Sequence, residues 1–252
     1  MIVKDYIKHF NQQSENYLLF RPNYPAVLYD YLVHLVKDHQ SAWDCGTGNG
    51  QAAVALAAYF DQVIATDINR AQLELAPKNE KIHYLCCLAE STPILDNSID
   101  LITVAQALHW FNFDLFYDEV RRVGKPAGVI AAWCYSLGKF NSSLDEIIAK
   151  LYRDILGDNY WPAERHYIDE EYRTIPFPFK KRELASFTIE KEMGFSQLLG
   201  YLNTWSAIKE YQFRNQVNPI NLIFKELEAA WGKLDKRHRM HWPLHLLVGS
   251  IH

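Results

Sequence analysis

Residues 42–51 place an acidic side chain just before a run of alternating glycines, in the order Ala-Trp-Asp-Cys-Gly-Thr-Gly-Asn-Gly-Gln. The acid is Asp44, and the glycines are Gly46, Gly48 and Gly50. Glycine adopts positive φ readily and has no Cβ, so a ligand can lie against the backbone of such a turn. The alanine-rich segment that follows predicts a helix whose first N–H groups face the turn. This pattern indicates a site for a nucleotide-like cofactor.

The spacing of the glycines distinguishes between cofactors. A dinucleotide-binding turn has the pattern G-x-G-x-x-G, whereas this chain has G-x-G-x-G. A carboxylate at Asp44 would repel a pyrophosphate and attract an ammonium group. The motif therefore favours a cofactor with an amino-acid end, and a nicotinamide dehydrogenase is a weaker alternative.

A second acid ends the next predicted strand, residues 63–67, which read Val-Ile-Ala-Thr-Asp. Asp67 follows the glycine turn by roughly twenty residues, the distance at which a carboxylate accepts hydrogen bonds from ribose hydroxyls. Asp67 could instead cap the helix predicted directly after it. Both can hold, and the spacing favours the ribose contact.

Residues 88–104 complete a pattern of three motifs. They read Leu-Ala-Glu-Ser-Thr-Pro-Ile-Leu-Asp-Asn-Ser-Ile-Asp-Leu-Ile-Thr-Val. Together with the glycine turn and Asp67, in this order and spacing, they make the chain resemble the class I S-adenosylmethionine-dependent methyltransferases. Within that family the chain resembles the trans-aconitate methyltransferase-like branch. The segments that carry the branch resemblance are 17–25 (Tyr-Leu-Leu-Phe-Arg-Pro-Asn-Tyr-Pro), 104–111 (Val-Ala-Gln-Ala-Leu-His-Trp-Phe) and 199–207 (Leu-Gly-Tyr-Leu-Asn-Thr-Trp-Ser-Ala).

The resemblance implies that S-adenosyl-L-methionine is the cofactor and S-adenosyl-L-homocysteine the product. It implies that Asp44 faces the methionine end of the cofactor. Relatives often carry an acid before Ala-Glu to meet the adenine amine, but this chain has Leu88 there. Adenine recognition would then fall to the backbone around Ala89 or to the Glu90 side chain. The expected cofactor-binding residues are Asp44, Gly46, Thr47, Gly48, Gly50, Asp67, Ile68, Ala89, Glu90, Gln106, Tyr17 and Arg21.

Aromatic and basic residues supply candidates for the acceptor side. Trp110 would wall the acceptor pocket together with Trp205, and His109 would hydrogen-bond or deprotonate the acceptor. A carboxylate acceptor needs no base, and the alternative for His109 and Trp110 is ordinary core packing. Arg21 with Tyr17 suits the methionine carboxylate, because guanidinium forks match carboxylates. Otherwise Arg21 lies on the surface.

These residues require a sheet whose strands end along one edge. Residues 41–135 alternate predicted strands and helices, which implies right-handed βαβ crossovers and a parallel sheet. A helix is predicted over 113–123, a turn over 124–128 and a fifth strand over 129–135. The resemblance implies an α/β, Rossmann-like class I methyltransferase sheet that is mostly parallel and seven-stranded. Its last strand is antiparallel, helices cover both faces, and a helical cap is added.

We expect a single domain over residues 1–252. Its parts are an N-terminal helical cap (1–40), a cofactor-binding core (41–135) and a substrate-side region (136–252). The substrate-side region is expected to contain a strand at 187–192, a helical insertion at 195–238 and a closing strand at 241–251.

Composition limits the partners. A net charge of −4 argues against nucleic acid, which usually needs a basic face. The cysteines form no C-x-x-C pair and the histidines lack metal-ligand spacing, so no metal is expected. The N-terminus is too polar for a signal peptide, and no apolar run approaches the roughly 20 residues of a membrane span. We therefore expect a cytoplasmic protein with no membrane partner, while the oligomeric state is left open.

Two hypotheses of different classes remain. The first is an enzyme that methylates a small molecule bearing a carboxylate or hydroxyl. The second is a cofactor-binding protein without turnover, such as a regulatory subunit or an inactive paralogue, because it would keep the same nucleotide motifs. A nucleic-acid methyltransferase is less favoured, since residues 106–109 read Gln-Ala-Leu-His where such enzymes commonly carry Asn/Asp-Pro-Pro-aromatic.

Overall fold

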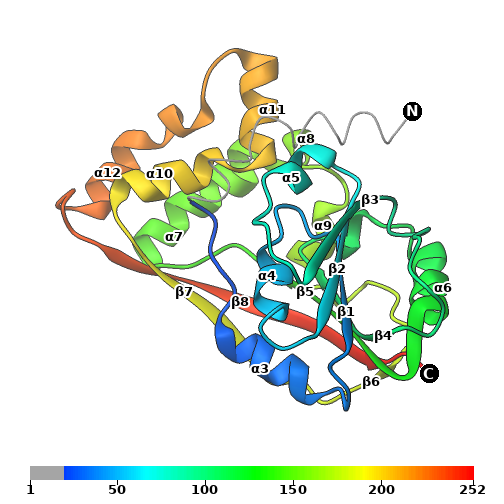
Figure 1. The fold of residues 1–252 in the computed structure, drawn as a ribbon. Coiled ribbons are helices and arrows are strands. Elements are labelled where there is room, and N and C mark those ends of the chain that lie inside the picture. Colours follow the sequence, from blue (N-terminus) through cyan, green and yellow to red (C-terminus); the bar gives the residue numbers. More distant parts are fainter. Residues whose placement is uncertain (1–19) are drawn as a thin grey trace.

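A computed structural model of the chain describes residues 20–252. Its core is an eight-stranded sheet in the order β3-β2-β1-β4-β5-β8-β6, with β7 also paired to β8 (Figure 1). The strands are β1 (Ser41–Cys45), β2 (Gln62–Asp67), β3 (Ile82–Cys86), β4 (Ile99–Ala105), β5 (Gly124–Tyr135), β6 (Lys180–Lys181), β7 (Phe187–Met193) and β8 (His238–Ser250).

The strand directions confirm the expected fold class. β1 to β5 are parallel, while β8 runs antiparallel to β5 and to β7. The additional strand is β6, which has two residues and pairs with the last residues of β8, whereas β7 pairs with its first half. The sheet is therefore the expected one with a short extra strand at its outer edge.

Helices and helical turns connect these strands. They are α3 (Ala26–His34), α4 (Gln51–Leu56), α5 (Arg70–Glu74), η1 (Leu108–Trp110), α6 (Phe113–Val123), α7 (Ser142–Ala149), the π-helix η2 (Lys150–Leu156), α8 (Gly157–Tyr160), α9 (Arg165–Asp169), α10 (Phe195–Asn203), α11 (Ser206–Asn215), η3 (Pro219–Leu222) and α12 (Phe224–Trp231). The helix expected at 113–123 is α6, which begins where the Asn112 side chain accepts a hydrogen bond from Leu115 N.

Helices cover both faces of the sheet because neighbouring strand residues point to opposite sides. Ala42 lies in one hydrophobic cluster with Leu32 of α3 and Leu56 of α4. Trp43, the next residue, lies in the other cluster with Phe116 of α6. Burial on both faces explains why the central strands are almost continuously apolar.

The prediction of a turn at residues 124–128 was wrong. The structure continues β5 through this segment, and Gly124 pairs with Ile99 of β4. The register shifts between Ile99 and Leu101, so a bulge accommodates the Gly-Lys-Pro-Ala-Gly sequence. Turn-forming residues here shape an irregular strand instead of ending it.

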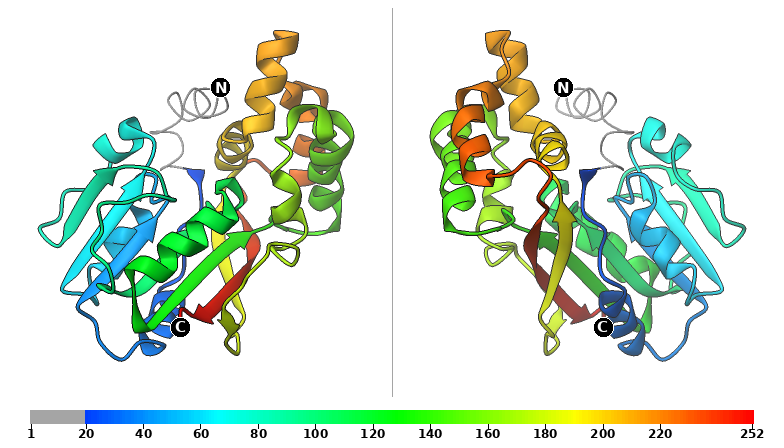
Figure 2. Two further views of the ribbon diagram at one scale, coloured as in Figure 1. Left: turned by 90° about the vertical axis from the view of Figure 1, so that its right-hand side faces the viewer. Right: turned by 90° about the vertical axis from the view of Figure 1, so that its left-hand side faces the viewer.

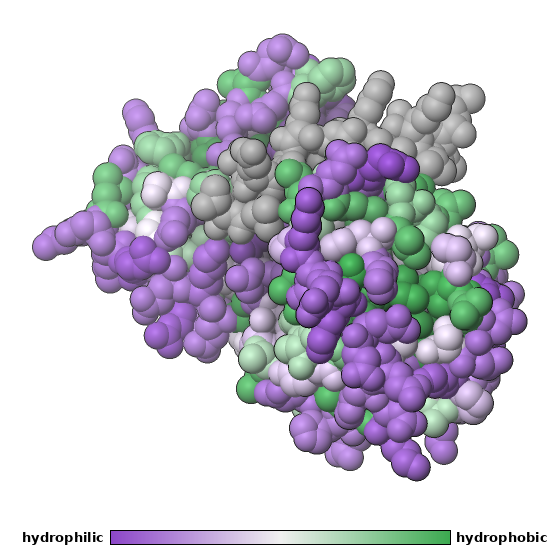
Figure 3. Space-filling model, viewed as in Figure 1, coloured by the Kyte–Doolittle hydropathy of each residue, from purple (hydrophilic) through white to green (hydrophobic). Residues whose placement is uncertain are grey.

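The segment between β7 and β8 is helical, as expected, and contains α10, α11, η3 and α12. Figure 2 shows α7 to α12 gathered at one end of the molecule, apart from β1 to β3. None of the helices in residues 20–252 is long and apolar enough to cross a membrane. On the face seen in Figure 3, hydrophilic residues cover most of the surface and hydrophobic residues form smaller patches.

Candidate functional site

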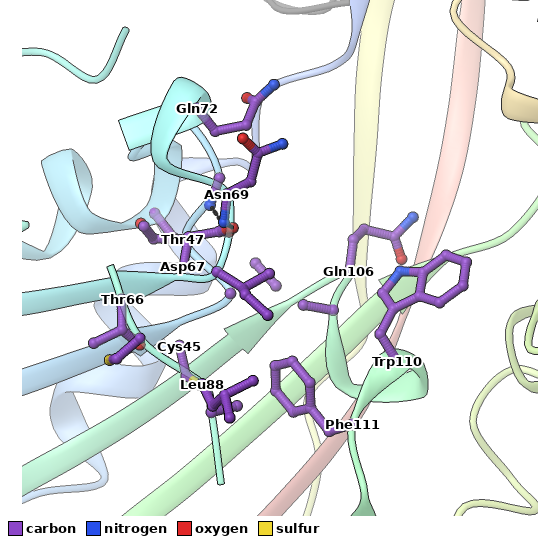
Figure 4. Close-up of a pocket in the computed structure, with 18 of the residues that line it drawn as sticks. Cys45, Thr47, Thr66, Asp67, Asn69, Gln72, Leu88, Gln106, Trp110 and Phe111 are labelled. Carbon is purple, nitrogen blue, oxygen red and sulfur yellow. Dashed lines mark hydrogen bonds between the residues drawn. The ribbon is translucent and has the colours of Figure 1, made fainter. Parts of the chain in front are cut away.

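A cavity of about 580 Å³ opens at the carboxyl ends of β1, β2 and β4. The strand order reverses between β1 and β4, and parallel sheets bind ligands at such a switch point. In Figure 4, Thr47, Asp67 and Asn69 lie on one side of the cavity, and Gln106, Trp110 and Phe111 on the other. The expected site residues that line it are Gly46, Thr47, Gly48, Asp67, Ile68, Ala89, Glu90, Gln106 and Trp110.

The glycine turn needs glycine for two different reasons. Gly46 has φ +67°, and a Cβ there would lie 2.5 Å from Ala107 Cβ, so glycine allows the turn to touch the loop after β4. Gly48 has φ +56°, and within residues 20–252 a Cβ there would meet no atom within 4 Å apart from its chain neighbours. Because Gly48 itself lines the cavity, we expect that Cβ to enter it. Gly50 does not line the cavity and lies beside the Tyr84 hydroxyl.

Asp44 lies behind the turn and does not line the cavity. Its carboxylate accepts hydrogen bonds from the hydroxyls of Thr47 (2.6 Å) and Thr103 (2.9 Å). These bonds tie the glycine turn to β4. Burial raises the pKa of the Asp44 carboxyl to about 6, against the opposing effect of the two hydroxyl donors.

We expect this buried carboxyl to make stability depend on pH. Folding raises its pKa from 3.8 to about 6. Between these values the folded state keeps a proton that the unfolded chain has released, so stability falls as pH rises through the window. Two pKa units correspond to about 3 kcal/mol. Asn cannot ionise, so Asp44→Asn should not show this loss. The difference in free energy of unfolding between Asp44→Asn and wild type should therefore shift in favour of the variant by about 3 kcal/mol between pH 4 and pH 7.

Urea unfolding at the two pH values measures this gain. Asp61→Asn is the matched control, because Asp61 is exposed. Parallel pH dependence in wild type and Asp44→Asn would contradict the expectation.

Asp67 lies at the end of β2 and lines the cavity. Its Oδ2 accepts a hydrogen bond from Gly48 N and its Oδ1 from Asn69 N, both at 2.8 Å. Burial raises the pKa of this carboxyl. The N-cap of α5 is Asn69, whose side chain accepts from Ala71 N, and not Asp67. Asp67 therefore does not cap α5, which was the alternative role that the sequence left open.

Asn69 adds an unsatisfied donor to the cavity. The residue is 5% exposed, and its Nδ2 has no hydrogen-bond partner within residues 20–252. A buried amide without a partner costs free energy of about 1–3 kcal/mol, so a ligand that accepts from it would stabilise this side chain.

The opposite wall is formed by the segments after β3 and β4. Glu90 Oε1 accepts a hydrogen bond from Asn112 N at 2.9 Å, which joins the two segments. Gln106 has φ +55°, an uncommon value for a residue other than glycine. Its Oε1 accepts from Tyr135 N at 3.0 Å, and its backbone N donates to Trp133 O at 2.8 Å. These bonds hold the ends of β4 and β5 together beside the cavity.

Two expected acceptor residues do not line the cavity. His109 is 5% exposed, and its Nδ1 lies 2.8 Å from the Tyr172 hydroxyl. Burial, with a smaller contribution from Arg165, lowers the pKa of His109 to about 3. Trp205 is also buried, in an aromatic cluster with Tyr152 and Trp161. The position of His109 corresponds to the core packing that the sequence left as its alternative.

Arg21 does not line the cavity either. Its Nε donates to Thr204 Oγ1 at 2.9 Å and its Nη1 to Tyr135 Oη at 3.0 Å. The guanidinium therefore joins the segment before α3 to the end of α10 and to β5. Tyr17 lies outside the described residues.

Several lining residues were missed by the sequence interpretation. Among them are Tyr24, Gln51, Asn69, Gln72, Cys87, Leu88, Phe111 and Asn112. Most stand within a few positions of a recognised motif, so their place beside a strand end was the available signal. No group of three or more His, Cys, Asp or Glu side chains in residues 20–252 could hold a metal.

Comparisons with known proteins agree with this geometry. Residues 43–132 match the methyltransferase domain family. A candidate methyltransferase of Dictyostelium discoideum is 38% identical over 96% of this chain and 94% of its own length. The solved structure of a candidate type II methyltransferase from Anaeromyxobacter dehalogenans superposes with a TM-score of 0.86 and 38% identity, over 92% of this chain and 98% of that one.

A more distant relative has a stated substrate. The malonyl-[acyl-carrier protein] O-methyltransferase of Marinomonas sp. is 26% identical over 73% of this chain and 74% of its own length. The sheet, the cavity at its switch point and these relatives lead to one assignment. The chain belongs to the class I S-adenosylmethionine-dependent methyltransferases.

Proposed function

We propose that the chain binds S-adenosyl-L-methionine in the cavity at the switch point and methylates a small molecule bearing a carboxylate or hydroxyl. The observation that carries the proposal is the open turn at Gly48 facing Asp67 in one cavity. The relative that acts on malonyl-[acyl-carrier protein] is named as an O-methyltransferase, which supports an oxygen acceptor. The net charge of −4 gives no support for nucleic acid.

The lining residues fit the parts of this cofactor. Asp67 would accept from the ribose hydroxyls, and the unsatisfied Nδ2 of Asn69 would donate to the nucleoside. Leu88 and Phe111 offer apolar surfaces to adenine, together with Ile68 and Ala89. The open space at Gly48 leaves room for the chain of the methionine part.

Four expected residues act indirectly in this proposal. Asp44 positions the turn through Thr47, and Gly50 lets the turn pack on β3. Glu90 fixes its segment through Asn112 N, and Arg21 fixes the end of β5 through Tyr135. We keep the contact of Tyr17 with the cofactor as a proposal from the sequence.

The cofactor supplies a methyl group on a cationic sulfur when bound. The chain's contribution is orientation, because aligning acceptor, methyl and sulfur supplies several kcal/mol in an in-line displacement. Gln106 and Trp110 would form the wall beside the reacting atoms. The bonds of Gln106 to β5 keep that wall fixed.

We propose that His109 supports Trp110 and does not act as a base. The two rings lie 4.8 Å apart, and a group with a pKa of about 3 stays neutral from pH 6 to pH 9. His109→Asn should therefore keep the wild-type pH dependence of turnover and bind S-adenosyl-L-homocysteine within about twofold of wild type. Steady-state rates across this pH range test it. If the pH–rate profile of wild type has a limb near neutral pH and His109→Asn lacks that limb, the expectation is refuted.

The proposed function is tested by a turnover screen with S-adenosyl-L-methionine across carboxylates, alcohols, phenols and amines, read by formation of S-adenosyl-L-homocysteine. We expect product with an acid or hydroxyl compound. Binding of the cofactor without turnover of any acceptor would favour a cofactor-binding protein without catalysis. Failure to bind the cofactor would overturn the proposal.

We also propose a finer placement of the chain. The segments 17–25, 104–111 and 199–207 support the trans-aconitate methyltransferase-like branch. We propose one methyltransferase domain over 1–252, with the cofactor-binding core at 41–135 between an N-terminal cap and a substrate-side region. Continuous pairing from β3 through β5 to β8 supports that organisation.

A further inference from the structure

A second cavity, of about 1050 Å³, lies beyond the carboxyl end of β5. The segment after β5, the helices α7 and η2, and α9 line it. Residues of the two cavities are connected through β5. Gln106 of the first cavity binds the backbone of Tyr135, and Ser136, the next residue, lines the second cavity. Ligands of parallel sheets bind at the carboxyl ends of strands, so this position suits an acceptor.

Arg165 gives the second cavity a cation with spare donors. Its side chain is 18% exposed. Within residues 20–252, its only hydrogen bond runs from Nε to Tyr152 Oη at 2.6 Å, and its only carboxylate neighbour within 4 Å is Asp169, 3.6 Å from Nε. The terminal guanidinium nitrogens therefore have hydrogen-bonding capacity that these residues do not use. Such a fork matches the two oxygens of a carboxylate or phosphate.

The carboxylates of this cavity leave the terminal nitrogens of Arg165 without a partner within residues 20–252, although Asp169 forms an ion pair with its Nε. They are Asp145, Glu146, Asp158, Asp169 and Glu171. Asp145 accepts from Phe140 N at 2.7 Å, and Asp169 accepts from the Tyr152 hydroxyl at 2.6 Å. Glu146 and Asp158 are exposed, so solvent ions screen them.

Aromatic rings hold the guanidinium in place. The Arg165 Cζ lies 4.8 Å from the centre of the Trp161 ring and 5.3 Å from that of Tyr152. The two rings pack against each other at 4.7 Å. A guanidinium fixed in this way loses little conformational entropy when an anion binds.

A strained turn links residues of the two cavities. Glu171 and Tyr172 are consecutive residues with φ of 59° and 61°. Left-handed conformations in residues other than glycine cost about 1–3 kcal/mol each and cluster at functional sites. This turn brings Glu171 to the second cavity and the Tyr172 hydroxyl to His109, whose ring packs on Trp110 of the first cavity. The turn thus connects a residue that lines the second cavity to Trp110 of the first.

We propose that the second cavity binds the methyl acceptor through an anionic group, a carboxylate or a phosphate, that sits on the terminal nitrogens of Arg165. The proposal rests on the methyltransferase function proposed above for its acceptor role. It makes Arg165 a residue that determines acceptor specificity, without a part in cofactor binding.

The test measures binding of benzoate and of inorganic phosphate by calorimetry, with and without S-adenosyl-L-homocysteine. The proteins are wild type, Arg165→Gln, Arg165→Lys and the matched control Arg153→Gln, because Arg153 lines the same cavity but is exposed. We expect one of the anions to bind wild type with a Kd in the millimolar range and to bind Arg165→Gln at least tenfold more weakly. Arg153→Gln should stay within about twofold of wild type, and all variants should keep their affinity for S-adenosyl-L-homocysteine.

The two anions distinguish a carboxylate from a phosphate as the recognised group. For any acceptor found in the turnover screen, Arg165→Gln should raise KM at least tenfold with little change in kcat. If Arg165→Gln is unfolded, Arg165→Lys decides, because it keeps the charge but loses the fork. Wild type that binds neither anion, or equal binding by wild type and the Arg165 variants, overturns the proposal. If the protein does not bind S-adenosyl-L-homocysteine, the proposed function is contradicted. The anion titrations without that ligand would still test the role of Arg165.

Discussion

The Asp67→Ala variant is expected to bind S-adenosyl-L-homocysteine about a hundred times more weakly than wild type. Two hydrogen bonds from ribose hydroxyls to a carboxylate contribute about 1.5 kcal/mol each at least, and about 3 kcal/mol corresponds to this change in Kd. The variant also leaves Gly48 N and Asn69 N without their acceptor. The turn that supports the methionine part should therefore loosen as well.

Calorimetric titration measures the effect, with thermal unfolding to show that the variant folds. Glu74→Ala is the control, because Glu74 is exposed on the helix that follows Asp67. It should bind like wild type. An Asp67→Ala protein with wild-type affinity would remove Asp67 from the cofactor site.

Alanine substitutions at Gly46 and Gly48 are expected to separate folding from binding. At Gly48 the new Cβ enters the cavity, so Gly48→Ala should weaken S-adenosyl-L-homocysteine binding at least about tenfold while the left-handed backbone costs about 1–2 kcal/mol of stability. At Gly46 the Cβ would lie 2.5 Å from Ala107 Cβ. Overpacking and backbone strain together should destabilise Gly46→Ala by about 3 kcal/mol.

For both variants, urea unfolding measures stability and calorimetry measures the affinity for S-adenosyl-L-homocysteine. Each variant serves as the control for the other, because the substitution is the same and the positions differ by two residues. The interpretation fails if Gly48→Ala binds as tightly as wild type, or if it is the less stable of the two.

The sequence predicted the parts of the fold that depend on local pattern. The strand expected at residues 63–67 is a short apolar run, and its limits were nearly right, since β2 spans Gln62–Asp67. The mostly parallel sheet and its antiparallel last strand followed from the family resemblance and were confirmed. The prediction for residues 124–128 was wrong because pairing with β4 overrides the turn-forming residues of this segment.

Site residues were harder to predict, because a strand end does not fix the direction of each side chain. Asp67 is the last residue of β2 and Asp44 the last but one of β1, yet Asp67 lines the cavity, whereas Asp44 is buried and accepts hydrogen bonds from two threonine hydroxyls. His109 and Trp110 are consecutive in the sequence, but only Trp110 lines the cavity. Arg165 belongs to no recognised motif, although its neighbours Tyr152, Trp161 and Asp169 lie close to it in the sequence.

The most direct test of the central claim is a crystal structure of the protein with S-adenosyl-L-homocysteine. We expect the ribose hydroxyls within hydrogen-bonding distance of the Asp67 carboxylate and the homocysteine part beside Gly46 to Gly48. Ligand density at another place on the protein, or none at a saturating concentration, would contradict the account.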